Sequence, residues 1–511
     1  MISTQLLRRI LAALPCVAFA LPSGAQTFEI QCPAGTTLHP AAADGTPNPD
    51  IKCQQLSGGD GFATMADGTQ TYLFSFGPLS GLKNIKDGLP GTLPAADFLQ
   101  PYQPNPASPS DPDTAGNPNG AVGLEPQPDA PGHVDPRPVM DVGVLNGNMP
   151  APLIAIAEDD ELFLTLTNVG QIMRPDLFEQ HTVHFHGYPN ASSFYDGVPD
   201  ASVAINIGGS FTYYYLAPDA GTYIWHCHIT PPEHLQMGMV GQLYVRPRQD
   251  KLTSGDDLGA HLLAANKHAA VDAAATGRSC SDILCTGQTP VPKAADSSGN
   301  TGVTGGQLYA YNDGDGSTQY DVEYPIQIHG FDPDFHFVGM TFNPENFTDS
   351  KNKYFLLNGR SYPDTVTPGA LSTQVADGSD HFSQPLPTII NIPFGGRALL
   401  RFGDLETNEF QTLASLGIPM HVIALNARLL RDLAGNNLAY DTNSITMGGG
   451  ESLDVILDAH DTAKYPAGAT YYLYTPNLDH LSNDAENFGG LMTEVHICPG
   501  AVDSLKQCVG P

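Results

Sequence analysis

The chain has 511 residues, with 54 acidic and 22 basic side chains, and its formal net charge is −32 at neutral pH. This length exceeds what one domain usually holds, so two domains with separate cores are the first expectation. An acidic surface repels nucleic acids and anionic membranes, so we expect neither as a partner. It favours a cationic substrate only slightly, because exported proteins are often acidic for solubility alone.

Residues 1–25 have the pattern of a secretory signal peptide. The basic start MISTQLLRR precedes the apolar run ILAALPCVAFAL, and small residues follow at Ser23, Gly24 and Ala25. The apolar run is too short to span a bilayer comfortably, and the small residues mark a cleavage site. We therefore expect an exported protein, periplasmic or extracellular.

Seven cysteines remain once this segment is removed. Exported proteins usually pair their cysteines, so an odd number needs a reason. Proximity in the sequence suggests three disulfides, although six cysteines allow fifteen pairings: Cys32–Cys53, Cys280–Cys285 and Cys498–Cys508. Cys227 is then left unpaired, as a metal-binding thiolate must be.

Most of the chain reads as short strands. Residues 26–61 are polar and rich in Gly and Pro, which predicts an extended N-terminal arm. Strand-like segments with period-two alternation follow over residues 62–247: residues 71–76, 139–147, 153–157, 161–170, 181–187, 210–217, 221–229 and 241–247. The Pro-, Asn- and Asp-rich residues 101–138 are predicted to form a surface loop. The pattern favours a Greek-key β-sandwich or barrel.

A second domain of similar size is expected over residues 320–498, where strand-like segments resume. Residues 248–319 are interpreted as a linker with a short helix over residues 256–275, and residues 499–511 as a C-terminal tail. The segment GATYYLYTPNLDH…GGLMTEV has the outline of GTYIWHCHI…GMVGQLYV in the first domain. We interpret this likeness as an internal duplication whose second copy lacks the metal residues. The predicted fold class is all-β.

The candidate chemistry centres on GTYIWHCHITPPEHLQMGM, residues 221–239. Two imidazoles, a thiolate and a weak axial thioether are the ligands of a blue-copper centre. A strand with Cys227 as a small buried hydrophobic residue is the ordinary alternative, but several spaced ligands in one stretch favour a metal site. The ligand candidates in this segment are His226, Cys227, His228, His234 and Met239.

A second cluster of imidazoles lies upstream in HTVHFHG, residues 181–187. Residues two apart on a strand face the same side, so His184 and His186 point together, as do His226 and His228. Cys227 points the opposite way, where it can meet His181, His234 and Met239. The pattern predicts two metal sites joined through Cys227 and its neighbours.

These motifs resemble the multicopper oxidase superfamily, the cupredoxin-fold group that holds laccases, metal oxidases and copper nitrite reductases. LNGNMPAPLI, HTVHFHG, the Asp196-Gly197 pair and GTYIWHCHI…H…GM occur in family order, and YFLLNGRSYPDT and IPMHVIALNARLL resemble second-domain strands. By position, the resemblance implies a type 1 copper at His181, Cys227, His234 and Met239. It implies an oxygen-reducing cluster at His184, His186, His226 and His228.

The activity implied by the resemblance is oxidation of a phenol-like or metal-ion donor at type 1 copper. Electrons then pass along His–Cys–His to a cluster that reduces dioxygen to water. The expected cofactor is copper: type 1 together with type 2 and type 3, or with type 2 alone. Asp196 lies where the family often keeps a proton-delivering acid, although it reads equally well as a turn residue.

The chain departs from the family pattern in three ways. Cys227 and His234 are seven residues apart rather than five, with Pro231 and Pro232 between them. The first domain supplies four histidines where a trinuclear cluster needs eight. The second domain has only singly placed histidines, of which His421 and His480 lie on or near strand ends.

Because the chain shows too few histidines for a trinuclear cluster, we expect a homo-oligomer, with a trimer favoured, in which a neighbouring subunit completes the cluster. One alternative is a copper nitrite reductase-like enzyme with type 1 and mononuclear type 2 copper, although His184 and His228 exceed that pattern. Another alternative is a non-catalytic copper or electron-transfer protein, which would need only the type 1 set.

Overall fold

A computed structural model describes residues 29–124, 134–187, 192–217, 219–255, 303–339, 347–375, 378–432, 435–484 and 486–510. The predicted signal peptide, the helix expected over residues 256–275 and the Cys280–Cys285 pair lie outside these residues. Within them strands predominate and helices are short, so the predicted all-β class is confirmed. None of the helices in these ranges is long and apolar enough to cross a membrane.

The first half of the chain, residues 29–255, forms two sheets that enclose a core around Trp225. One sheet has the order β2-β1-β5-β7 with β3 beside β1, and the other β4-β9-β8-β6. The strands are β1 (Ile51–Thr64), β2 (Gln70–Pro78), β3 (Leu93–Pro94), β4 (Ile154–Ala157), β5 (Glu161–Gly170), β6 (His184–Phe185), β7 (Ser210–Leu216), β8 (Gly221–His226) and β9 (Val240–Arg246). The helices are α2 (Leu82–Lys86), α3 (Ala95–Phe98), α4 (Pro136–Gly143), α5 (Pro231–Gln236) and the short 3₁₀ helices η1 (Pro112–Thr114), η2 (Ser193–Tyr195) and η3 (Arg248–Lys251).

The second half, residues 303–510, forms two larger sheets around its own core. Their orders are β13-β12-β17-β23-β19-β20, with β21 beside β19, and β16-β25-β24-β18-β22. The strands are β10 (Leu308–Tyr309), β11 (Gln319–Tyr320), β12 (Val322–Phe331), β13 (Tyr354–Leu357), β14 (Leu371–Gln374), β15 (Asp380–Gln384), β16 (Ile390–Ile392), β17 (Arg397–Asp404), β18 (Gln411–Leu416), β19 (Met420–Leu425), β20 (Arg428–Leu429), β21 (Tyr440–Thr442), β22 (Ser444–Met447), β23 (Ser452–Asp458), β24 (Thr470–Tyr474) and β25 (Met492–Ile497), with the helices α8 (Pro333–Gly339) and η4 (Asp364–Val366).

The strand pairing of the first half recurs in the second. β1 runs parallel to β5, which pairs antiparallel with β7, and β12, β17 and β23 pair in the same way. β4 runs parallel to β9, which pairs antiparallel with β8, and β16, β25 and β24 repeat that arrangement. β24 thus corresponds to β8, the strand of the HCH motif. The repeated pairing is what an internal duplication produces.

Two segments differ from the sequence-based expectations. Residues 139–147 read as a strand, yet residues 136–143 form α4, because the Asp135 carboxylate accepts a hydrogen bond from the Arg137 N–H at 2.9 Å and Pro136 occupies the first turn. The expected arm, residues 26–61, includes most of β1. The Gly-rich run of this segment pairs within the sheet and passes close to His181. A Cβ on Gly58 would lie 2.7 Å from the His181 ring, so the absence of a side chain at this position allows the close approach.

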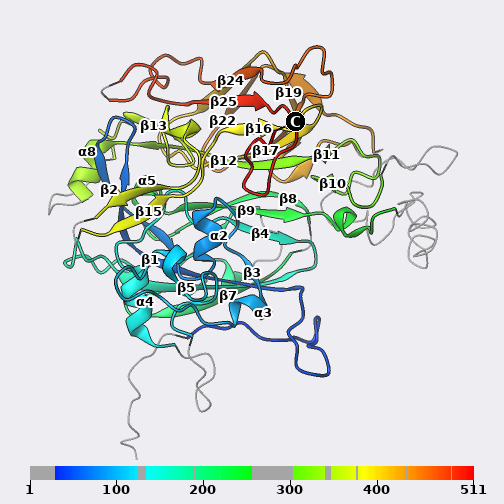
Figure 1. Ribbon diagram of the computed structural model, residues 1–511. Helices are drawn as coiled ribbons and strands as arrows, with labels where there is room; N and C mark the ends of the chain where they lie inside the picture. The colour runs from blue at the N-terminus through cyan, green and yellow to red at the C-terminus, as the bar shows by residue number, and fades with distance from the viewer. Residues whose placement is uncertain are drawn as a thin grey trace, which may run out of the picture.

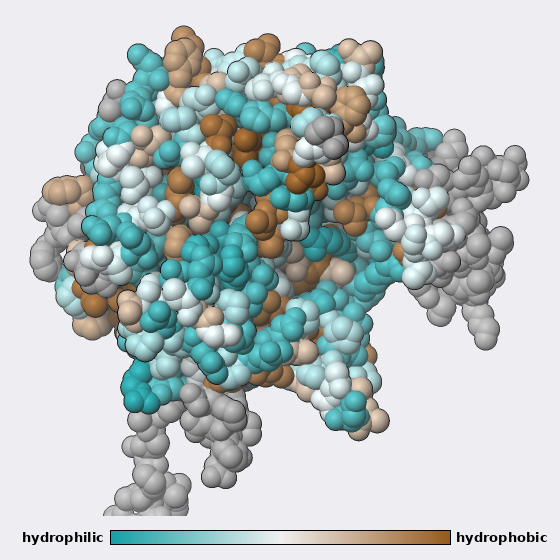
Figure 2. All heavy atoms as spheres, in the orientation of Figure 1, coloured by the Kyte–Doolittle hydropathy of each residue, from teal (hydrophilic) through white to brown (hydrophobic). Residues whose placement is uncertain are grey.

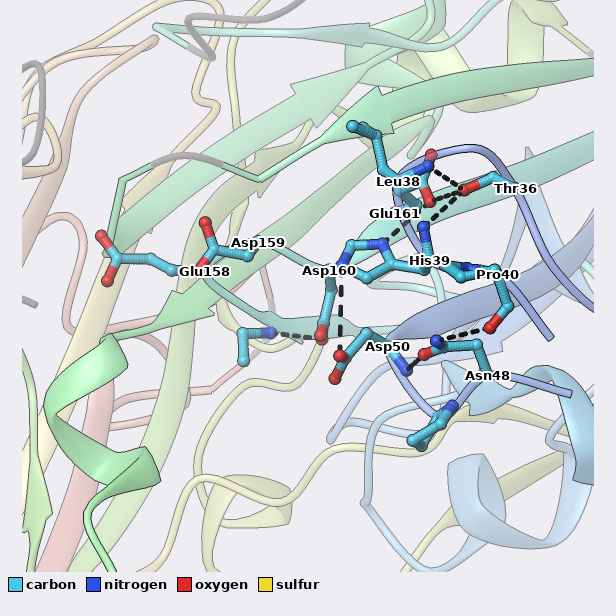
Figure 3. A network of polar contacts seen from close by, with 12 residues as sticks. Thr36, Leu38, His39, Pro40, Asn48, Asp50, Glu158, Asp159, Asp160 and Glu161 are labelled. Atoms are coloured by element: carbon cyan, nitrogen blue, oxygen red, sulfur yellow. Dashed lines mark hydrogen bonds and ion pairs between the residues drawn. The ribbon is translucent and has the colours of Figure 1, made fainter. Parts of the chain in front are cut away.

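The part of the expected arm that precedes β1 packs against the turn between β4 and β5 (Figure 3). The His39 Nδ1 lies 2.9 Å from the Glu161 carboxylate, which also accepts a hydrogen bond from the Thr36 hydroxyl. The disulfide between Cys32 and Cys53 ties the same segment to β1. That disulfide and Cys498–Cys508 confirm two of the three suggested pairings, and Cys227 is unpaired.

The two halves pack where β8 of the first meets β17 and β23 of the second, and where β9 meets β12 (Figure 1). Arg401 is fully buried in this interface, and its guanidinium donates to Glu323 at 2.9 Å and to the Thr222 hydroxyl at 3.2 Å. On the outside, Figure 2 shows hydrophobic residues in small groups among hydrophilic ones. The metal-ligand candidates therefore lie in the first half, which the second half contacts through this buried interface.

Candidate metal centre

The first cluster lies inside the first half, where β8 ends. His181, Cys227, His234 and Met239 are all fully buried. The ligand atoms of His181, Cys227 and His234 lie within 4.8 Å of one another. The Met239 carbonyl accepts a hydrogen bond from the Cys227 N–H at 3.2 Å, which brings these two residues together.

The surroundings of Cys227 favour a thiolate. The Thr182 N–H donates to its Sγ at 3.4 Å, and the Nδ1 of His234 lies 3.2 Å from it. Burial opposes ionisation of the thiol, but His234 and His181 outweigh it and hold the pKa of Cys227 well below its usual value. Burial likewise disfavours charge on His234, yet the thiolate and Glu179 raise the pKa of this imidazole to about 10.

The chemistry of this donor set fits a copper ion. Two imidazoles, a thiolate and a thioether match a type 1 site. Neither ring nitrogen of His181 has a hydrogen-bond partner, although both are buried. Buried polar atoms are rarely left unpaired, so a metal ion that bonds to His181 would supply the missing partner.

The second cluster forms where β6 pairs with β8, with His184 opposite His226 in the register. The ligand atoms of His184, His186 and His226 lie within 4.8 Å of one another. His228 lies beside them, its ring 4.9 Å from that of His184 and stacked on that of His226 at 5.5 Å. The structure therefore gathers the four imidazoles that the alternation of strand residues predicts.

Backbone groups surround the three closest rings. The Nδ1–H of His184 donates to the Asp196 carbonyl at 2.7 Å, and that of His226 donates to the Cys227 carbonyl at 2.6 Å. The His186 ring lies beside Gly450, where an added Cβ would stand 3.4 Å from its Nδ1. Hydrogen bonds such as those of His184 and His226 fix the tautomer of a metal-binding histidine, and they leave the Nε2 atom of each ring as the ligating one.

The Nε2 atoms of two of these rings converge in a way that suits a metal. Those of His186 and His226 are only 2.9 Å apart, and metal–imidazole bonds of about 2.0 Å would allow both to bind one ion. Burial, together with the neighbouring imidazoles, lowers the pKa of His226 to about 3. This ring is therefore in the neutral, ligating form at neutral pH.

The second cluster opens into a cavity of about 560 Å³ between the two halves. Asp196, at the end of η2, lines this cavity, and its carboxylate lies 3.5 Å from the Nδ1 of His184. The predicted acid thus stands beside the cluster. The second half supplies Asn426, Gly450 and Ser452 to the opposite wall.

The two second-domain histidines singled out from the sequence have partners in their own half. His421 bonds Asp441 at 2.8 Å, while His480 lies between Gln411 and Glu409 and stacks on Phe355.

Sequence reasoning missed Gly450 and Glu179. The Glu179 carboxylate lies 3.3 Å from the Nε2 of His234. Glu179 precedes His181 by two residues, and this position could have indicated it from the sequence. No pattern in the sequence links Gly450 to His186.

Comparison with known proteins agrees with this geometry. Residues 131–250 match a family model described as multicopper oxidase. Laccase abr2 of Aspergillus fumigatus is 33% identical over 109 residues, which cover 21% of this chain and 17% of that protein. A copper-containing nitrite reductase of Rhizobium meliloti is 34% identical over 115 residues, 22% of this chain and 27% of that protein.

These matches span less than a third of the length of the relatives. A solved structure of a blue copper oxidase from Nitrosomonas europaea aligns with a TM-score of 0.48 at 16% identity, over 87% of this chain and 85% of that one. The family-model match spans the part of the chain that carries both clusters. Residues 131–250 of the chain therefore resemble a multicopper oxidase domain.

Proposed function

We propose that the chain is an exported, laccase-like multicopper oxidase that oxidises a phenol-like or metal-ion donor and reduces dioxygen. The observation that carries this proposal is the position of Cys227 between two clusters. Cys227 belongs to the first cluster, while its neighbour His226 belongs to the second. A purely electron-carrying protein would need the first cluster alone.

Copper bound at these residues would supply one-electron redox chemistry at the first cluster and oxygen reduction at the second. The chain's own part is to hold the ligands in place before copper arrives. Burial keeps His226 neutral. The carbonyls of Asp196 and Cys227 hold the Nδ1 atoms of His184 and His226, so the Nε2 atom of each ring is the one that can bind copper. His226–Cys227–His228 then links the two clusters through covalent bonds.

Two carboxylates serve the proposed reaction from outside the ligand sets. Asp196 faces the cavity and is placed to hand protons to reduced oxygen. Glu179 lies against the Nε2 of His234, and its side chain is partly exposed. Glu179 is therefore placed to receive a cation or the hydroxyl proton of a phenol next to the first cluster.

The chain holds four cluster histidines, so we propose that identical subunits, three in the favoured arrangement, complete the second cluster. The cavity beside His184 and His186 is large enough to admit a side chain from a neighbour. Light scattering of the copper-loaded protein tests this directly. A monomer with full oxidase activity would overturn it.

The decisive experiment is copper loading of the purified protein, followed by metal analysis and oxygen consumption with phenolic, ferrous, cuprous and manganous donors. We expect more than two coppers per chain and oxygen uptake with at least one donor. His186→Gln should abolish oxygen uptake and leave the thiolate–copper absorption in place. If no donor supports oxygen uptake, the oxidase proposal fails.

A copper nitrite reductase is the second candidate, because a 115-residue segment is 34% identical to such an enzyme. The three imidazoles whose ligand atoms lie closest together also suit one mononuclear copper. Two coppers per chain and turnover of nitrite with a reduced dye would favour this function. One copper per chain with no turnover would favour an electron carrier.

A further inference from the structure

Helix α5 occupies the longer spacing between Cys227 and His234, and it controls where two ligand candidates lie. The His234 N–H donates to the Thr230 carbonyl at 3.1 Å, and the Met239 N–H donates to the His234 carbonyl at 2.9 Å. The spacing between His234 and Met239 is therefore set by this short helix. Six residues cannot hold a helix in place through their own hydrogen bonds, so tertiary contacts must do so.

Gln236, the last residue of α5, is buried against the second half. With its amide in the orientation that gives both atoms a complementary partner, the nitrogen lies 3.1 Å from the Gly330 carbonyl and the oxygen 2.8 Å from the Asp332 N–H. The side chain of Asn352 is 3.1 Å away and itself donates to Glu406 at 2.7 Å. One amide thus joins α5 to the end of β12.

Two buried imidazoles of the second half lie close in sequence to Gly330 and Asp332, which Gln236 contacts. The Phe331 ring lies 5.3 Å from that of His329 and 4.2 Å from that of His336. The Nδ1–H of His336 donates to the Tyr72 carbonyl at 2.5 Å. Both rings are almost fully buried, and the other ring nitrogens have no hydrogen-bond partner of regular geometry.

The two imidazoles reach α5 through Phe331. The Phe331 ring shares a cluster of buried residues against which Leu235 of α5 packs, and it lies 3.8 Å from the position that a Cβ on Gly238 would take. Because both imidazoles lie against the Phe331 ring, they fix the surface on which the end of α5 packs.

We propose that Gln236, His329 and His336 are positioning residues for the type 1 site. They form an anchor, contributed mainly by the second half, that fixes the end of α5 and so sets His234 and Met239 relative to Cys227. The proposal rests on the proposed function, because it assigns His234 and Met239 to a type 1 copper. Under this proposal, the second half supports the type 1 site without supplying a metal ligand to it.

The test compares Gln236→Leu and His329→Phe with a matched control, Gln242→Leu. Gln242 is also a buried glutamine that crosses to the second half, donating to the Arg401 carbonyl at 2.8 Å, but it lies on β9. In the metal-free protein, amide hydrogens of residues 235–240 should exchange about tenfold faster in the two anchor variants and stay near wild type in Gln242→Leu.

Copper-loaded protein supplies the second readout. The anchor variants should shift the thiolate–copper absorption and the reduction potential of the type 1 site, and leave the copper signal of the histidine cluster unchanged. Should Gln236→Leu fail to fold, His329→Phe and His336→Phe decide the question. Folded variants with wild-type exchange and wild-type absorption would overturn the anchor.

The two proposals can fail separately. If the wild-type protein shows no thiolate–copper absorption after loading, the proposed function is wrong, while the exchange measurement still decides whether the anchor holds α5. If the wild type shows the absorption and neither anchor variant alters it, the proposed function stands and the anchor is wrong.

Discussion

Gly450 is the residue of the second half that lies against the ring of His186. Its φ of 102° lies in a region that L side chains rarely adopt, and an added Cβ would lie 3.4 Å from the ring of His186. A side chain here would both strain the backbone and push against the imidazole. His186 depends on this glycine for its orientation.

We therefore expect Gly450→Ala to lower oxygen uptake by about tenfold or more and to leave the thiolate–copper absorption unchanged. Steady-state oxygen consumption and absorption spectra of the loaded variant provide the measurement. Gly468→Ala is the matched control, because Gly468 also has a positive φ of 79° but no atom within 4 Å of an added Cβ. Equal losses in both variants would point to backbone strain alone.

Glu158 gives a residue-scale prediction about pH. Burial raises the pKa of this carboxyl from 4.5 to about 7, although the Asn312 amide and the Arg248 and Ala220 N–H groups oppose the shift. The folded chain then binds a proton that the unfolded chain releases, so this group's contribution to stability falls as pH rises from 4.5 to 7. The fall should amount to about 3 kcal/mol.

Denaturant unfolding of wild type and Glu158→Gln at pH 4.5 and pH 8 measures this contribution. The variant should gain stability relative to wild type as the pH rises, since a neutral amide carries no such penalty. Asp200→Asn, at an exposed carboxylate, should show no comparable trend. A difference between Glu158→Gln and wild type that is the same at both pH values would contradict the prediction.

At the scale of elements, β17 carries the buried charge that joins the halves. Arg401 is fully buried, its guanidinium bonds Glu323 and Thr222, and it lies 4.7 Å from the Tyr244 ring. Removing one partner of a buried ion pair leaves the other uncompensated. Arg401→Met should therefore cost about 3–5 kcal/mol of unfolding free energy.

Arg397, also on β17, is the comparison for this variant. It is partly exposed and pairs with Asp458 at 3.0 Å, and such surface pairs contribute about 1 kcal/mol or less. Chemical denaturation of Arg401→Met and Arg397→Ala measures both costs. Similar small losses would mean that the buried network does not hold the halves together.

The sequence predicts strands in which polar and apolar side chains alternate. It does not predict features that depend on contacts between residues far apart in the chain. β8 and β23 were both expected from their patterns, and both are strands. β1 was assigned in large part to the arm because its glycines resemble a loop, and their role becomes visible only where His181 packs on them. The contacts of Gln236 and Gly450 join residues far apart in the chain, so no local pattern reveals them.

At the scale of the whole molecule, the net charge of −32 makes a prediction about the donor. Opposite charges steer diffusional encounter, and added salt screens this attraction. The kcat/KM for a cationic donor should fall as ionic strength rises, while that for a neutral phenol should stay nearly constant. Stopped-flow assays from low to high salt test this, and an unchanged cationic rate would exclude steering by the surface.

The position of the second half has a consequence for how the chain can evolve. A half that carries none of the predicted metal ligands would ordinarily be free to change in sequence or to be lost. Here that half lines the cavity with Gly450 and receives the end of α5 through Gln236. Deletion of the second half would remove support from the half with the ligand candidates, so selection on one half constrains the sequence of the other.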